Sequence, residues 1–298
     1  MKKITINNLK DKEKLLYYIK EKYPNLSSAV LHKTFRNKDI KVNSKRITDP
    51  NYEIKNGDIV EIYIQDFLLF GFPKNIDIVF EDDNILVVNK PQGILSNNEG
   101  KPIDEPTFDE FVRNKLGNNL KICHRLDRNT SGLLIFAKTE RSYESLLQGF
   151  KESYIKKEYI AYVNDANFKY NHFVLENYLL KDDKEGYSKI YDTFINGSQK
   201  VVTEISVENA YKNKNYAILR VKIHTGKTHQ IRSVLSYISH PIIGDSKYGK
   251  NEINKKFRKY KQLLFAVRYT FSFPKTDFLN YLNNIEIKLD ENLYKNKI

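Results

Sequence analysis

Residues 124–137 read HRLDRNTSGLLIFA and are the most informative stretch of the chain. Within it, Asp127 lies between Arg125 and Arg128, directly before an apolar run that has the character of a buried strand. A nearby positive charge favours the ionised form of a carboxylate, and the strand would hold that carboxylate on a rigid element. Taken alone, such an aspartate is more often a structural ion pair. Its setting nevertheless indicates a charged nucleophile or base, and the motifs described below favour catalysis.

The composition favours a polyanionic partner. The chain has 298 residues, enough for one large domain or for a catalytic domain with a small module. Lys and Arg number 50 against 37 Asp and Glu, a formal net charge of +13, and each neutralised phosphate of a nucleic acid releases counterions. We expect nucleic acid rather than membrane, because no apolar stretch approaches the roughly 20 residues of a membrane span. The N-terminal residues lack the apolar core of a signal peptide.

Cysteine usage excludes several kinds of site. Cys123 is the only cysteine, so the chain has neither an intramolecular disulfide framework nor a Cys-cluster zinc site. We expect Cys123 to be a small buried hydrophobic residue, a reducing, cytoplasmic location, and no metal. A base deaminase acting on RNA is excluded because it needs a Cys-x-x-Cys zinc signature.

Residues 1–65 are expected to form a separate small module. An apolar stripe predicts a helix over Lys12–Tyr23, and Ser27 or Ser28 is a candidate N-cap for a second helix that ends at Arg36. Short alternating strands are predicted at Ile40–Asn43 and Ile59–Ile64. The segment has 14 Lys and Arg against 8 Asp and Glu, a net charge of +6, which is typical of an accessory RNA-binding module.

The same segment resembles a small RNA-binding domain first described in a ribosomal small-subunit protein and shared with some tRNA synthetases. The resemblance rests on Leu26-Ser27-Ser28, on residues 37–43 (NKDIKVN), on Ile47 with Asp49-Pro50 and on residues 56–60 (NGDIV). In that family the second helix and the following strand face RNA. The resemblance therefore places six basic residues on the binding surface: Lys33, Arg36, Lys38, Lys41, Lys45 and Arg46. Without it, they would count as ordinary solvated charges.

Residues 66–75 are expected to be a linker, because they contain the apolar, Gly/Pro-punctuated run FLLFGFP. Residues 76–298 then form a second domain. Its predicted strands outnumber its helices and are mostly joined by short turns, so a mixed α+β sheet fits better than an alternating βαβ fold. The strands are expected at Ile76–Glu81, Ile85–Lys90, Glu158–Val163, Val201–Val207, Tyr216–Ile223 and Leu264–Phe273, and the helices at Thr107–Leu116, Glu140–Ser153 and Thr228–Tyr237.

Two further segments could converge on Asp127. Residues 156–161 (KKEYIA) place Tyr159 at the start of a strand amid cations, and residues 225–232 (TGKTHQIR) lead to Arg232 in the first turns of a helix. An arginine can hold a carboxylate with two parallel hydrogen bonds, which fixes both its ionisation and its direction. A tyrosine offers a flat face for base stacking and a hydroxyl.

Together these segments resemble the RluA-type family of RNA pseudouridine synthases. The match also includes residues 81–82, 86–93 (LVVNKPQG), Lys157, 240–245 (HPIIGD) and 248–249, in the family's order from about residue 76 to 273. The resemblance implies the pseudouridine synthase fold, a mixed, largely antiparallel sheet with flanking helices and an active-site cleft. It implies isomerisation of uridine to pseudouridine in structured RNA without cofactor or metal. Large-subunit ribosomal RNA is the first expected substrate and tRNA the second, because members with this N-terminal module often modify ribosomal RNA.

The resemblance also assigns roles to residues. Asp127 acts on the target nucleotide, either attacking C1′ of the ribose or withdrawing a proton from C2′, while Tyr159 packs against the base and Arg232 forms an ion pair with the aspartate. Arg125 helps to expel the nucleotide or fills the gap that it leaves. Lys227 stands where the family usually has an arginine, which makes its phosphate contact less certain because bidentate geometry is lost. His229 and Gln230 are counted with the RNA-binding residues, although His229, like His124, is also readable as a hydrogen-bonded structural histidine.

A second reading remains open, in which the chain is a non-catalytic RNA-binding or ribosome-assembly factor that retains the fold. Asp127, Tyr159 and Arg232 are all present, so nothing in the sequence argues for lost activity. We expect a monomer without an obligate protein partner. Which uridine is modified depends on RNA shape and on surface loops that no short motif encodes.

Overall fold

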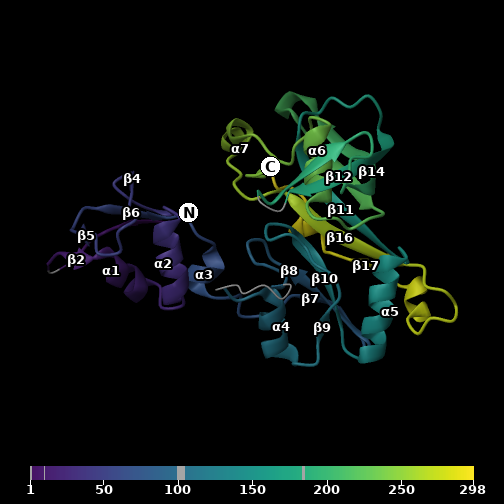
Figure 1. Ribbon diagram of the computed structural model, residues 1–298, viewed down its shortest axis with the longest axis horizontal. Helices are drawn as coiled ribbons and strands as arrows, with labels where there is room; N and C mark the ends of the chain where they lie inside the picture. Colours follow the sequence, from purple (N-terminus) through teal and green to yellow (C-terminus); the bar gives the residue numbers. More distant parts are fainter. Residues whose placement is uncertain (1, 10, 99–104, 183–184) are drawn as a thin grey trace. The chain divides into compact units, whose positions relative to one another are not determined.

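The computed structural model of the chain describes residues 2–9, 11–98, 105–182 and 185–298, which fall into two units (Figure 1). The smaller unit draws on residues 1–75 and 98–111, and the larger unit on residues 76–97 and 112–298.

The smaller unit is built on a four-stranded antiparallel sheet with strand order β1-β6-β3-β4. Helices α1 and α2 bury Leu15, Ile19, Leu31 and Phe35. As expected, Ser27 caps α2, because its hydroxyl accepts a hydrogen bond from the Val30 amide at 3.3 Å. The elements are β1 Lys2–Thr5, β2 Glu13–Lys14, α1 Leu15–Lys22, α2 Ser28–Arg36, β3 Ile40–Val42, β4 Lys45–Arg46, β5 Glu53–Ile54 and β6 Ile59–Ile62.

The helix expected from Lys12 starts three residues later, at Leu15. The reason is that Glu13 and Lys14 pair in antiparallel fashion with β5, which commits their backbone groups to a strand ladder. Helical periodicity alone does not reveal such a competing partner.

The segment expected to be a linker contains a short helix, α3 (Asp66–Phe70). Phe67, Leu68 and Leu69 of this helix are buried. Phe72 stacks on Phe111 with ring centroids 4.4 Å apart, within the smaller unit. Most apolar side chains of this segment therefore pack rather than face water, with Phe70 as an exposed exception, which differs from the behaviour of a flexible connector.

The larger unit contains an eleven-stranded mixed sheet, whose main path runs β13-β12-β14-β15-β11-β16-β10-β8-β7 (Figure 1). Only the β10–β16 pair is parallel among the described strands, so the predicted mixed, largely antiparallel α+β fold is confirmed. The strands are β7 Ile78–Glu81, β8 Ile85–Lys90, β9 Lys121–Ile122, β10 Ser131–Ala137, β11 Ile155–Asn164, β12 His172–Asp182, β13 Tyr187–Tyr191, β14 Gln199–Tyr211, β15 Tyr216–Ile223, β16 Leu264–Phe271 and β17 Ile287–Lys288.

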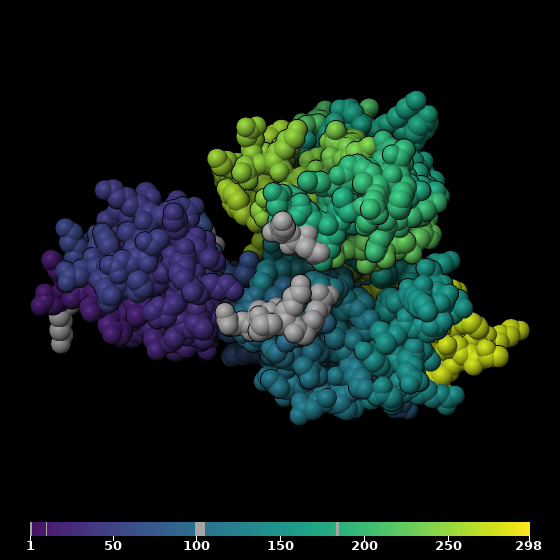
Figure 2. All heavy atoms as spheres, viewed as in Figure 1, coloured from purple at the N-terminus to yellow at the C-terminus, as the bar shows by residue number. Residues whose placement is uncertain are grey.

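Helices cover this sheet at two places. Helix α5 (Glu140–Lys151) packs Leu146 into the main core beside Leu133 and Ile135 of β10, and α6 (Gln230–Tyr237) packs Val234 into a smaller cluster on β12–β14. Two further helices are α4 (Phe108–Leu116), which was expected, and α7 (Asn251–Phe257), which was not. Figure 2 shows a furrow between the teal part of the larger unit, before β11, and the green part that follows β11.

Candidate active site

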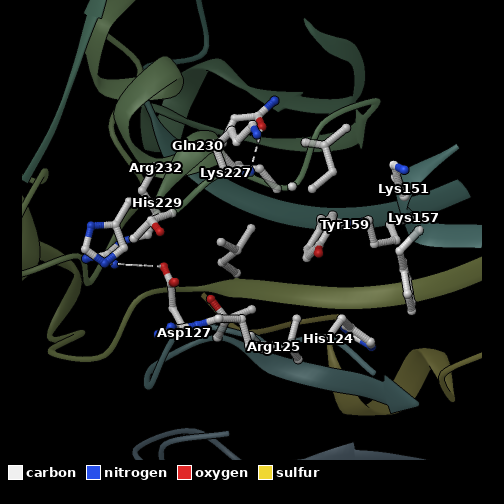
Figure 3. Close-up of a pocket in the computed structure, with 18 residues that line it drawn as sticks. His124, Arg125, Asp127, Lys151, Lys157, Tyr159, Lys227, His229, Gln230 and Arg232 are labelled. Carbon is white, nitrogen blue, oxygen red and sulfur yellow. Dashed lines mark hydrogen bonds and ion pairs between the residues drawn. The ribbon is translucent and has the colours of Figure 1, made fainter. Parts of the chain in front are cut away.

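A cavity of about 360 Å³ opens in the larger unit where three segments distant in sequence meet. The loop before β10 contributes Asp127, β11 contributes Tyr159, and the first turn of α6 contributes Arg232 (Figure 3). The structure thus brings together the three residues that the sequence singled out. The cavity is lined by His124, Arg125, Leu126, Asp127, Thr130, Phe150, Lys151, Lys157, Tyr159, Ile223, Gly226, Lys227, Thr228, His229, Gln230, Ile231, Arg232 and Leu264.

Asp127 forms an ion pair with Arg232. The Nη1 atom of Arg232 donates to Oδ2 of Asp127 at 2.9 Å, across 105 residues of sequence. The side chain of Asp127 is 19% exposed and that of Arg232 only 9%. This ion pair is largely shielded from water, and it orients the carboxylate of Asp127 at the cavity.

Arg232 is in turn held by a second carboxylate, Asp245, which the sequence analysis quoted within a motif without giving it a role. Nε and Nη2 of Arg232 donate to Asp245 Oδ2 at 2.7 Å and Oδ1 at 3.1 Å. The Asp245 side chain has no exposed surface, and it also accepts from the amides of Lys247 and Tyr248. Burial acts to raise the pKa of Asp245, but the hydrogen bonds and charge of Arg232 hold it below its usual value.

His229 stands beside this pair in a left-handed backbone conformation, with φ of 59°. Its Nε2 lies 3.9 Å from Asp127 Oδ2, and its Nδ1 lies 3.0 Å from the Tyr248 hydroxyl. Burial lowers the pKa of His229 to about 4, so the ring is neutral near pH 7. The Tyr248 hydroxyl also accepts from the Ser188 amide at 2.6 Å, which fixes its position beside the His229 ring.

Tyr159 contributes a buried ring and hydroxyl to the cavity. Its side chain belongs to β11, where a bulge interrupts the pairing with β16 between Glu158 and Tyr159. Glu158 pairs with Arg220 at 3.0 Å and Arg268 at 3.7 Å, neither of which lines the cavity. Burial, with the nearby charge of Asp127, raises the pKa of Tyr159, so the hydroxyl keeps its proton.

The other sequence-predicted residues of this segment differ in accessibility. Arg125 and Lys227 are exposed at the cavity, whereas Gln230 is 2% exposed. The Gln230 amide accepts from Thr225 Oγ1 and from the Lys227 amide, and it donates to β14. These bonds fix the turn that carries Lys227 and occupy both ends of the Gln230 amide.

A buried lysine supports the loop that carries Asp127. Lys90, at the end of β8, donates through Nζ to the carbonyls of Pro91, Ile94 and Arg128 at 3.0, 2.7 and 3.2 Å. Burial lowers the pKa of Lys90 to about 7. Since Arg128 directly follows Asp127, this contact ties the β8 hairpin to the site, which is a role that the sequence motif did not reveal.

Comparison with known proteins identifies the family of the chain. The family model for RNA pseudouridylate synthase matches residues 84–237. An RNA pseudouridine synthase described as uncharacterised, from Mycoplasma capricolum, is 33% identical over 95% of this chain and 96% of its own. The chain belongs to the RNA pseudouridylate synthase family. Its reaction is the isomerisation of uridine in RNA to pseudouridine.

Further pseudouridylate synthases match this chain over most of its length, and a solved structure is similar to it in fold. A protein named ribosomal large subunit pseudouridine synthase C, from Buchnera aphidicola, is 30% identical over 95% of this chain and 96% of its own. A protein of the same name from Rickettsia bellii is 31% identical over 91% of this chain and 93% of its own. The solved structure of human RNA Pseudouridylate Synthase Domain Containing 1 covers 73% of this chain and 84% of its own, with a TM-score of 0.59 and 22% identity. This last likeness concerns the fold.

The six basic residues predicted to bind RNA in this pseudouridylate synthase lie on adjoining elements of the smaller unit. Lys33 and Arg36 are on α2, Lys38 follows it, Lys41 is on β3, and Lys45 and Arg46 form β4. All are exposed except Lys41, which is half-buried and lies 5.1 Å from the centre of the Tyr63 ring. Lys41 and Arg46 are paired across β3 and β4 and therefore share a face.

Other expectations from the sequence concern His124, Cys123, metals and membranes. His124 Nε2 accepts from the Ile135 amide at 3.1 Å and lies 3.0 Å from the Tyr269 hydroxyl, which is the structural arrangement that we anticipated. Cys123 is buried and free.

Within the described ranges no group of His, Cys, Asp and Glu side chains is arranged to hold a metal ion. No helix among the same residues has both the length and the apolar character needed to cross a bilayer.

Proposed function

We propose that the chain forms pseudouridine at specific positions of large-subunit ribosomal RNA, with tRNA as the second candidate substrate. Relatives that match over nine-tenths of their length and more are named ribosomal large subunit pseudouridine synthases. The net charge of +13 supplies the attraction for a folded polyanion. The ion pair between Asp127 and Arg232 inside an open cavity is the observation on which the catalytic part of the proposal rests.

We assign to Asp127 the chemical step on the ribose of the target nucleotide. Its carboxylate either attacks C1′ of the ribose or withdraws the proton from C2′, and in both cases the bond between N1 and C1′ breaks. The base then rotates and C5 forms a bond to C1′. On the first route this bond displaces the carboxylate from C1′, and on the second route Asp127 returns the proton to C2′. The C5 proton is then lost to a base, and N1 takes up a proton. Arg232, held by Asp245, keeps the carboxylate correctly directed throughout.

The remaining cavity residues bind the nucleotide after it leaves the RNA stack. Tyr159 presents a flat ring for the uracil, and its protonated hydroxyl is available for the proton transfer at C5. Flipping costs a few kcal/mol of unstacking, and Arg125, exposed at the cavity, is placed to fill the gap. Lys227 contacts the backbone beside the site, and His229 supplies a neutral donor. Gln230 acts through the turn that it holds rather than through RNA.

The domain assignment is part of the same proposal. Residues 1–65 form the RNA-binding module, residues 66–75 the connection and residues 76–298 the catalytic domain, and the basic surface on α2, β3 and β4 binds RNA. The chain works as a monomer in the cytoplasm without a cofactor, a metal or an obligate protein partner. The single cysteine fits a reducing location.

Mapping of pseudouridines in total RNA from cells with and without this protein tests the substrate. We expect one or a few sites in large-subunit ribosomal RNA to lose their signal, and expression of the Asp127→Asn variant to leave them unmodified. Loss confined to tRNA would overturn the ribosomal assignment. No loss at any position, with ribosome assembly impaired, would favour the non-catalytic role.

A further inference from the structure

Lys157 lies in the cavity on the same strand as Tyr159, two residues before it. It is neighboured there by Phe150, Lys151, Gly226 and Lys227. Figure 3 shows Lys151 and Lys157 on the side of the cavity away from Asp127, with Tyr159 between. The cavity thus has a carboxylate at one side and a lysine at the other.

The Lys157 ammonium has no anionic or carbonyl partner among the residues that the structure describes. The Phe150 ring lies beside it, with the ring centre 5.2 Å from Nζ. His124 does not offer a charge, since burial lowers the pKa of its ring to about 3, and Asp127 is already bound to Arg232.

Three other largely buried cations of the larger unit have carbonyl or carboxylate partners, and Lys157 differs from them in this respect. Lys90 donates to three carbonyls, Arg232 to two carboxylates, and Arg220 to Glu158 and Glu208. Burial without a compensating partner lowers the pKa of Lys157 to about 8, so it is still mostly cationic near pH 7. Lys157 is half-buried, so its ammonium is only partly solvated, and another molecule that enters the cavity can supply the missing anion.

The wall of the cavity is open toward Nζ at Gly226. A Cβ atom placed on Gly226 would lie 3.0 Å from Nζ, so a side chain at this position would displace the flexible end of Lys157. Glycine therefore lets the backbone of the turn come close to the ammonium.

We propose that Lys157 binds a backbone phosphate of the substrate RNA, adjoining the nucleotide whose base packs on Tyr159. This inference rests on the proposed function. A phosphate is favoured over a uracil carbonyl because only the phosphate carries the full negative charge that an enclosed ammonium lacks. A phosphate anchored opposite Asp127 would fix the sugar between the two and direct C1′ and C2′ toward the carboxylate.

The test compares Lys157→Met with Lys156→Met, which removes the same charge from an exposed neighbour on the same strand outside the cavity. Release of tritium from RNA labelled at uracil C5 gives kcat and KM, and equilibrium binding of the same RNA over a range of salt gives affinity without turnover. For Lys157→Met we expect KM and Kd to rise about 10-fold or more. The slope of log affinity against log salt should become shallower by about 0.7–0.9, the value for one phosphate.

Lys156→Met should leave KM, Kd and the salt slope unchanged, and Lys157→Arg should restore most of the affinity because it keeps the charge. The melting temperature of Lys157→Met should not fall, since the side chain removed is a half-buried cation without an anionic partner. An unchanged salt slope in Lys157→Met would overturn the proposal, as would a fall in kcat alone, which would indicate contact with the base. A wild-type protein that binds RNA but never releases tritium would instead refute the proposed activity, and the binding slope would still decide the role of Lys157.

Discussion

At the scale of single residues, the site depends on how one guanidinium is shared. Arg232 uses Nε and Nη2 for Asp245 and leaves Nη1 for Asp127. The resemblance implied that Arg232 forms an ion pair with Asp127, and the structure shows this pair, with Arg232 on α6, 105 residues further along the chain. Asp245 therefore positions a residue that contacts the proposed catalytic group, although it does not itself line the cavity.

Substitution of Asp245 tests this arrangement. Asp245→Asn leaves Arg232 enclosed with a neutral partner, and breaking a buried ion pair costs about 3–5 kcal/mol. We expect chemical denaturation to show a loss of that order and single-turnover kinetics to show a large fall in rate. Asp192→Asn is the control, because Asp192 bonds the exposed Tyr237 hydroxyl outside the cavity, and it should change both quantities little. Wild-type rate and stability in Asp245→Asn would contradict the positioning role.

The burial of His124 predicts a dependence of stability on pH. Burial lowers the pKa of His124 from 6.5 to about 3. Between these values the unfolded chain binds a proton that the folded chain does not, so the free energy of unfolding should fall by up to a few kcal/mol as pH drops from about 6.5 toward 4. Denaturation curves at a series of pH values measure this. His124→Gln, which does not titrate, should show a shallower decline, and an equal decline would exclude His124 as the source.

At the scale of elements, β10 and β16 approach so closely that only glycine fits at Gly132. Gly132 has φ of 114°, and a Cβ atom there would lie 2.1 Å from the carbonyl oxygen of Ala266. Gly132 and Ala266 are paired partners in the one parallel ladder among the described strands of the sheet. This contact holds the end of the Asp127 loop against the strand that also pairs with Tyr159.

Gly132→Ala should therefore destabilise the larger unit strongly. Positive φ costs about 1–3 kcal/mol, and the overlap with the Ala266 backbone should cost roughly another 1–3 kcal/mol. Gly197→Ala is the matched control, since its φ of 83° carries similar strain but its added Cβ would meet only Leu180 Cδ1 at 3.5 Å. Thermal melting should show the larger loss in Gly132→Ala. Equal losses in the two variants would show that the close approach is unimportant.

The sequence predicted those elements that are marked by residues close together in the chain. Ser27 marks the start of α2, and the apolar run after Asp127 is β10, because a cap and a buried run are readable within a few residues. Strands β12 and β13 were missed, since their burial depends on partners in β14 and α6. Helix α6 begins at Gln230 rather than Thr228, because His229 adopts a left-handed conformation.

Of the candidate site, the sequence likewise predicted one part and not another. Asp127, Tyr159 and Arg232 were found because ordered motifs carry them, and the cavity brings them together. The pair between Asp127 and Arg232 was also expected, but the groups that support the site were not assigned. The contacts of Arg232 with Asp245, of His229 with Tyr248 and of Lys90 with the Arg128 carbonyl each depend on tertiary geometry that spacing along the chain does not encode.

At the scale of the whole molecule, positive charge is concentrated in the N-terminal part of the chain. The first 65 residues carry +6 of the net +13 in under a quarter of the length. Six of these cations lie on α2, β3, β4 and the turn after α2. Such a surface should raise RNA affinity without touching the bond-breaking step.

Replacement of Lys33, Arg36 and Lys45 by Gln should weaken RNA binding and make the slope of log affinity against log salt shallower by up to about 2–3. The rate at saturating RNA should not change. The control replaces Lys14, Lys22 and Lys55, which are equally exposed and carry the same charge but lie outside α2, β3 and β4. If both triple variants lose the same affinity, net charge rather than this surface attracts RNA.

Release of tritium from RNA labelled at uracil C5, measured side by side for wild type and Asp127→Asn, tests most directly whether the carboxylate paired with Arg232 carries out the isomerisation. The RNA is total RNA from cells that lack this protein. We predict steady release by the wild type and none above background by Asp127→Asn, with RNA binding and melting temperature close to those of the wild type. Release by Asp127→Asn at the wild-type rate would contradict the account.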